Sequence, residues 1–275
     1  MRKAVLAGAL LLVGAAAAAL FAPRPSLARD WAVDHAEPAA AVFDGHRLRV
    51  RHVRDFRYAA DGTPIPGYYD ASFDLDSLES AWYVLTTFSR TSRIPAHGFV
   101  SFGFAGGRYL SVSVEARRER DEGYGIVAGA LRRFELIYVV GDERDLIGRR
   151  AAVDGDDTYL YPVRGTPEAI RRALVAMLER ANALQDRPEF YNSLWNNCTS
   201  NLVRHVNQAA PGRIPAGWRV LLPGYTDEVA LALGLIDAGS DLATARARYR
   251  ANDRARSAMA SDSFSVLIRR SGGKE

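Results

Sequence analysis

The sequence predicts an α+β fold in which helices pack on an antiparallel sheet. Several segments before residue 165 alternate apolar and polar residues with period two and are joined by turns that contain glycine. Helical periodicity appears mainly after that point, and such segregation is typical of α+β domains. The 275 residues, 48% of them hydrophobic, are enough for one sizeable core, so we expect one domain.

The predicted strands begin with a hairpin. Residues 41–43 and 46–58 flank Asp44-Gly45, a strong two-residue turn signal. We expect a loop over residues 61–69, a short turn over 73–80, and a Pro-containing loop over 90–96. Further strands are predicted at residues 81–88, 97–104, 108–118, 136–140 and 157–164.

The clearest predicted helix covers residues 166–184. Thr166 can cap it, Pro167 suits its first turn, and an apolar stripe follows at the helical spacing. A second helix is expected to start at Cys198 and to run to about Gln208. Other helices are predicted at residues 123–134 and 226–235, and residues 241–275 form a basic tail without a strong period.

The first 28 residues resemble an export signal. Arg2 and Lys3 precede an uncharged run over residues 4–22, and Ser26-Leu27-Ala28 provides a small-residue cleavage site. The run is also long enough to span a bilayer, so residues 1–28 are either a signal peptide or an N-terminal membrane anchor. In both cases we expect residues 29–240 to form an exported, periplasmic domain.

Composition argues against several functional classes. The formal charge is +4, but three positive charges lie in the leader, which leaves +1 for residues 29–275 and no basic stripe for nucleic acid. Neither a metal-binding motif nor a phosphate-binding loop is present, so no metal or cofactor is expected. The sequence leaves the oligomeric state open.

Cys198 is the single cysteine, so an internal disulfide is impossible. Asn196 and Asn197 are capping residues, and apolar periodicity begins only after Cys198, which places the thiol in the first turn of a helix. There the backbone N–H groups and the helix dipole favour the thiolate and can stabilise an oxyanion. The alternative is a small buried cysteine that only packs.

His97 is the histidine best placed to act as the base for Cys198. It opens an alternating strand, whereas His205 lies about 10 Å along the helix from Cys198, and His46 and His52 have the pattern of a solvent-facing strand. His35 lies in an irregular stretch.

The hairpin register suggests a partner for His97. Pairing Val100 with Val112 and Phe102 with Leu110 matches apolar residues on one face. The same register sets His97 opposite Glu115, which could orient and charge-stabilise it. The alternative is an ordinary cross-strand surface pair.

Four residues near the cysteine are candidates for substrate or oxyanion contacts. Asn197 and Thr199 flank Cys198, and Tyr191 and Trp195 precede it closely enough to line an acyl groove. Packing is the alternative for the two aromatic side chains.

Three separated segments resemble the family of the Lnb-type N-terminal periplasmic domain. They are His97-Gly98-Phe99-Val100-Ser101-Phe102-Gly103-Phe104, the run from Tyr138 to Asp145, and the run from Tyr191 to Thr199. The resemblance covers about residues 30–223.

This resemblance implies a circularly permuted papain-like or NlpC-like fold, with the histidine early and the cysteine late. It implies that Cys198 is the nucleophile and His97 the base of a lipoprotein N-acyltransferase, which moves an acyl chain to an N-terminal amine. The expected partners are a lipid or lipoprotein substrate and the membrane surface. Characterised members continue into a C-terminal membrane region, and this sequence contains no second run that could span.

Three functions therefore remain open from the sequence. A thioester on Cys198 that passes to an amine makes an acyltransferase, and one that passes to water makes a peptidase, amidase or lipase. A binding or scaffold protein of the envelope would keep the fold with an unreactive thiol.

Overall fold

The computed structural model describes residues 23–59, 61–89, 91–217, 219, 222–239 and 241–270. Most of the predicted leader, residues 1–22, and the last five residues of the predicted tail lie outside these ranges. Helices and strands are mixed and the sheet is mainly antiparallel, which confirms the α+β class. The circular permutation stays a prediction.

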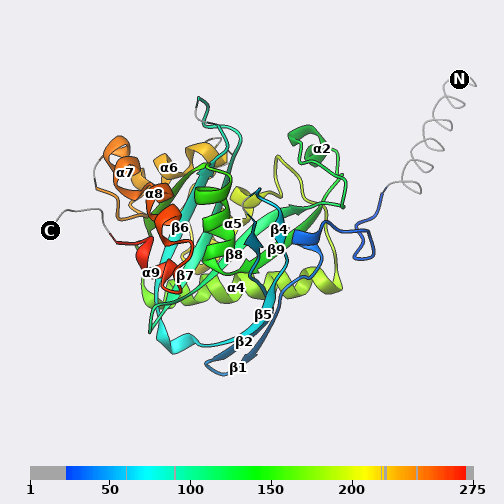
Figure 1. The fold of residues 1–275 in the computed structure, drawn as a ribbon, viewed down its shortest axis with the longest axis horizontal. Helices are drawn as coiled ribbons and strands as arrows, with labels where there is room; N and C mark the ends of the chain where they lie inside the picture. The colour runs from blue at the N-terminus through cyan, green and yellow to red at the C-terminus, as the bar shows by residue number, and fades with distance from the viewer. Residues whose placement is uncertain are drawn as a thin grey trace, which may run out of the picture.

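An eight-stranded sheet forms the centre of the described fold (Figure 1), in the order β1-β2-β9-β8-β7-β6-β10, with β5 paired to β2. Its neighbouring strands are antiparallel except β2 and β9, which are parallel. A separate pair of strands joins β3 to β4. The strands are β1 (Ala40–Asp44), β2 (Arg47–Arg54), β3 (Arg57–Tyr58), β4 (Pro64–Ile65), β5 (Tyr68–Asp74), β6 (Leu78–Thr87), β7 (Ala96–Phe104), β8 (Arg108–Arg117), β9 (Glu135–Gly141) and β10 (Asp157–Pro162).

Helices cover both faces of this sheet. One core contains side chains of α4 and α5, and a second lies under α3, η3, α8 and α9. The helices are α2 (Ile126–Ala130), α3 (Glu143–Gly148), α4 (Pro167–Asp186), α5 (Cys198–Ala209), α6 (Thr226–Ala232), α7 (Leu242–Tyr249), α8 (Asn252–Ala258) and α9 (Phe264–Leu267), with single turns η1 (Val33–His35), η2 (Leu75–Ser77), η3 (Arg149–Val153) and η5 (Pro223–Tyr225).

The predicted register of β7 and β8 is confirmed. Val100 pairs with Val112 and Phe102 with Leu110. Phe102, Leu110 and Val112 are buried in the core beneath α4 and α5, and the half-buried Val100 packs against it. Because side chains alternate along a strand, this register also fixes which polar residues share the opposite face.

The two clearest helices are confirmed with their caps. Thr166 accepts a hydrogen bond from the Ala169 N–H at the start of α4, and Pro167 occupies the first turn. Helix α5 begins at Cys198, as predicted. Helix α2 is shorter than the predicted helix over residues 123–134.

Four expectations about the first half were wrong or only partly right, the turn over 73–80 among the latter because it contains η2. The hairpin turn lies at Gly45-His46, one residue later than predicted, because Asp44 still pairs with Arg47. The strand predicted over residues 46–58 breaks after Arg54, and β3 joins another sheet. The predicted loop at 61–69 and turn at 73–80 contain β4, β5 and the start of β6.

The C-terminal segment differs from the predicted tail. Ala255 and Ala258 of α8 are buried, as is Ala251 just before this helix. Helix α9 buries Phe264. These side chains belong to the second core, so the segment up to Arg270 packs on the sheet. Among the residues that the structure describes, no helix is long and apolar enough to cross a membrane.

Candidate active site

Cys198 is the first residue of α5 and is 3% exposed. Asn197 caps the helix: its side chain accepts from the Ser200 N–H, and the Ser200 hydroxyl accepts from the Asn197 N–H. This reciprocal capping box fixes the first turn. The thiol therefore lies at the positive end of the helix dipole, where a thiolate is favoured.

His97 projects from β7 and belongs to a chain of hydrogen bonds that continues on β8. The Ser113 hydroxyl donates to Glu115 Oε1 over 2.8 Å, and its oxygen lies 2.7 Å from His97 Nε2. Since the Ser113 proton is already given to Glu115, Nε2 must be the nitrogen that carries the imidazole proton. This leaves Nδ1 to accept the proton of Cys198.

Glu115 therefore acts on His97 mainly through Ser113. The direct separation between His97 Nε2 and Glu115 Oε1 is 4.0 Å, longer than a hydrogen bond. The predicted juxtaposition of His97 and Glu115 is confirmed, but Ser113 as the bridge was missed. The signal was available, because Ser113 and Glu115 are two residues apart on β8 and share a face.

His35 supports the other oxygen of this carboxylate. The Arg118 N–H donates to His35 Nδ1 over 3.2 Å, so Nε2 carries the proton and donates to Glu115 Oε2, also 3.2 Å away. His35 is buried, and its role could not be predicted because 80 residues separate the two partners. Both carboxylate oxygens are thus held.

The electrostatics favour a thiolate–imidazolium pair. Burial raises the pKa of the Cys198 thiol, but the hydrogen bond and charge of His97 outweigh it and bring that pKa below its usual value. Burial lowers the pKa of His97, yet its interactions with Cys198 and Glu115 bring it above the usual value. Burial also raises the pKa of Glu115, but the hydrogen bond of His35 and the charge of His97 bring it well below 4.5.

The start of α5 also offers donors for an oxyanion. The cap occupies the N–H of Ser200, and the N–H of Asn201 bonds to the Asn197 carbonyl. The N–H groups of Cys198 and Thr199 are the first two of the helix and face outward from its end. The Thr199 hydroxyl lies 3.8 Å from Cys198 Sγ.

Asn197 acts as a positioning residue, and its predicted contact with substrate stays a prediction. Its side-chain oxygen accepts from Ser200, and its Nδ2 donates to the Ser193 carbonyl over 2.7 Å. Both ends of the amide are engaged within the protein.

Tyr191 and Trp195 separate in the structure. Tyr191 is buried, and the charge of Cys198 contributes to raising its pKa, after burial itself, so it lies beside the site. Trp195 is 60% exposed on the outer surface, and neither aromatic residue lines the cavity described below. The acyl groove expected at these two side chains stays a prediction, separate from that cavity.

Tyr83 was missed by the sequence reasoning. A Cβ added to Gly98 would lie 2.5 Å from the Tyr83 hydroxyl, so glycine is needed for this close approach. The Tyr83 ring fills the space beside Gly98. Its hydroxyl bonds to Thr226 Oγ1 at 2.5 Å, and burial, with a smaller contribution from Cys198, raises its pKa.

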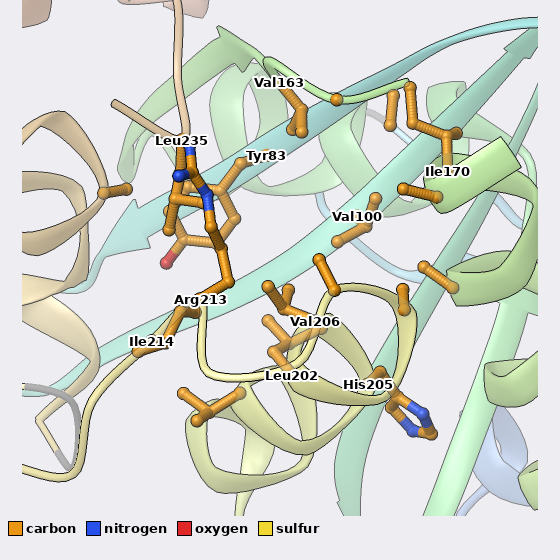
Figure 2. Close-up of a pocket in the computed structure, with 18 of the residues that line it drawn as sticks. Tyr83, Val100, Val163, Ile170, Leu202, His205, Val206, Arg213, Ile214 and Leu235 are labelled. Carbon is orange, nitrogen blue, oxygen red and sulfur yellow. The ribbon is translucent and has the colours of Figure 1, made fainter. Parts of the chain in front are cut away.

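An apolar cavity of about 540 Å³ lies next to the candidate nucleophile. Tyr83 and Thr199, which both border Cys198, form part of its wall. Figure 2 shows aliphatic side chains from β7, α4 and α5 around it, among them Val100, Ile170, Leu202 and Val206. Such a volume is typical of small-molecule sites.

The other histidines stay outside the chemistry. His205 borders the cavity and bonds through Nε2 to the Tyr138 hydroxyl at 2.7 Å. Burial lowers its pKa to about 4, so it is neutral. His46 and His52 are exposed, as predicted. Within the described part of the chain, no group of His, Cys, Asp and Glu side chains is suited to hold a metal ion.

Comparison with known proteins identifies one family. The model of the family described as the Lnb N-terminal periplasmic domain matches residues 66–224, more than half of the chain. The match contains His97, Ser113, Glu115 and Cys198, whereas His35 lies outside it. Neither the curated proteins nor the solved structures gave a match.

Proposed function

Because the chain belongs to the Lnb N-terminal periplasmic domain family, we propose that it is a periplasmic acyltransferase that carries an acyl chain as a thioester on Cys198. The observation that carries the proposal is the hydrogen-bonded chain from Glu115 through Ser113 to His97 Nε2, together with the interaction of His97 with the Cys198 thiol that lowers the pKa of that thiol. A nucleophile, a base and a group that orients the base are the parts that covalent acyl transfer needs.

In the first half-reaction, the thiolate attacks the carbonyl carbon of an acyl ester. The C–S bond forms, the C–O bond breaks, and the imidazolium of His97 gives its proton to the leaving alkoxide. The N–H groups of Cys198 and Thr199 stabilise the oxyanion.

In the second half-reaction, the acceptor amine attacks the thioester. The C–N bond forms, the C–S bond breaks, and the amine proton passes to His97 Nδ1, which restores the thiolate–imidazolium pair. The resemblance to lipoprotein N-acyltransferases supports an N-terminal amine as the acceptor.

The apolar cavity supports a lipid rather than a peptide as the acyl donor. Its lining follows α5 from Thr199 to Ala209, a length of about 15 Å at the helical rise. An extended hydrocarbon chain gains free energy along the whole of such a wall, whereas the polar backbone of a peptide would be left without hydrogen bonds there.

The test is intact-mass analysis of the full chain after incubation with phospholipid vesicles, followed by a diacylated lipopeptide with a free N-terminal amine. We expect an acyl-sized adduct on the wild type, none on Cys198→Ala, and transfer of the adduct to the peptide amine. Release of free fatty acid without transfer would indicate a hydrolase. Absence of any adduct, together with an unreactive thiol, would favour a binding protein.

A further inference from the structure

Exposed apolar side chains gather beside the candidate active site. Val127 and Leu131 are 72% and 71% exposed, which is unusual for residues of this size in so short a segment. Together with four neighbours they form what we call the apolar patch: Tyr124, Ile126, Val127, Leu131, Leu194 and Trp195.

The patch is one surface made from two segments. The Ser193 hydroxyl donates to the Ile126 carbonyl over 2.8 Å, and Asn192 Nδ2 donates to the Ala130 carbonyl over 3.1 Å. These bonds fasten the turn that carries Leu194 and Trp195 to helix α2.

The patch is also coupled to the nucleophile. The rings of Tyr124 and Tyr191 meet edge to face, with their centroids 6.2 Å apart, and Tyr191 belongs to the same buried cluster as Cys198. The Asn197 side chain, which caps α5, donates to the Ser193 carbonyl of the patch turn. The patch turn is therefore bonded directly to the residue that caps the helix of Cys198.

The N-terminal segment leaves the fold at the same end. The Ser26 N–H bonds to Glu135 Oε1 over 3.1 Å, and Arg29 pairs with the same carboxylate. Glu135 lies four residues after Leu131. Figure 1 shows the start of the described chain and α2 on the same side, opposite α6 to α9. The described chain thus begins on the side of the fold that carries the patch, and in the sequence it follows the uncharged run of residues 4–22.

We propose that the apolar patch docks on the surface of a lipid bilayer and brings the Cys198 site to its membrane substrate, an inference that rests on the proposed acyltransferase function. Tyr124 and Trp195 are residue types that favour the membrane interface. At the rim, Arg133 pairs with Glu122 and the exposed Arg132 adds one positive charge, so docking is driven mainly by apolar burial. Binding should therefore persist at high salt and on vesicles without anionic lipid.

The single cysteine makes a direct test possible. In full-length Cys198→Ser, either Val127→Cys or Val42→Cys accepts an environment-sensitive fluorophore at one site. Val42 is the matched control because it is 54% exposed on β1, outside the patch. With phosphatidylcholine vesicles, we expect a blue shift and quenching by lipids spin-labelled on the acyl chain at position 127 and neither at position 42.

A label at 127 that stays in water with vesicles present would overturn the proposal. The proposal would also fail if the label at 127 were shielded from water before lipid is added and the protein had twice its monomer mass in solution. A second copy of the chain would then cover the patch. A further variant, Val127→Asp, should weaken vesicle partitioning by roughly tenfold.

The same variant separates this inference from the proposed function. Val127→Asp should slow acylation of Cys198 by vesicle lipids by roughly tenfold and leave acylation by a soluble short-chain ester unchanged. If the wild type and Val127→Asp were acylated by vesicle lipids at equal rates, the docking surface would be contradicted but the proposed function would not. If the wild type reacted with neither substrate, the proposed function would be contradicted, while the fluorescence result would still stand.

Discussion

Single side chains set the protonation states on which the proposed chemistry depends. Ser113 can relay between His97 and Glu115 only if its proton points to the carboxylate, and this fixes the tautomer of His97. His35 is fixed in the same way by the Arg118 N–H. Glu115 is thereby kept ionised although it is mostly buried, and its charge supports the imidazolium.

Glu115→Gln tests this role. The Glu115 charge helps to raise the pKa of His97, so its removal lowers that pKa and moves the alkaline limb of the kcat/KM profile to lower pH. We also expect the maximum to fall roughly tenfold, because a hydrogen bond to a charged group contributes about 1.5 kcal/mol. The measurement is the pH–rate profile with a soluble ester, and Glu37→Gln, an exposed carboxylate, is the control. An unshifted alkaline limb would show that Glu115 does not act on His97.

At the scale of elements, the first turn of α5 holds the nucleophile in place. Asn197→Ala should lower the free energy of unfolding by about 1–2 kcal/mol, since it removes a helix cap. Thr166→Ala removes the corresponding cap of α4 and should cost about 1 kcal/mol. Only Asn197→Ala should also slow alkylation of Cys198 at neutral pH. Urea denaturation and alkylation kinetics measure the two effects, and equal alkylation rates would show that the cap serves stability alone.

Sequence patterns predicted the elements whose signals are local. The alternation of apolar and polar residues predicted the register of β7 and β8, and the capping residues predicted the starts of α4 and α5. Strand β5 was missed because Pro66 and Gly67 precede it and its partner β2 is distant in sequence. His35 and Tyr83 were missed for the same reason, because only the folded sheet brings them to Glu115 and Cys198.

At the scale of the whole molecule, the sheet, α4 and α5 together line the cavity, and the size of this cavity should determine which acyl chains fit. Ala173 lines the cavity, whereas Ala176, one turn further along α4, does not. Ala173→Phe should therefore shift the preferred ester to shorter chains. Each methylene that no longer fits should reduce kcat/KM by about fourfold relative to the wild type.

Ala176→Phe is the matched control and should keep the wild-type preference. The measurement is kcat/KM across a series of esters of increasing chain length. The same shift in both variants would indicate a general disturbance of α4, and no shift in either would place the acyl chain elsewhere.

The central claim is that His97 keeps Cys198 ionised, and the pH dependence of Cys198 alkylation tests it most directly. In the wild type, the rate should reach its plateau well below the ordinary thiol pKa of about 8.5, since His97 lowers the pKa of Cys198. In His97→Ala, the midpoint should move up to that ordinary value or above it. A wild-type midpoint already at the ordinary value, or one that His97→Ala leaves in place, would contradict the claim.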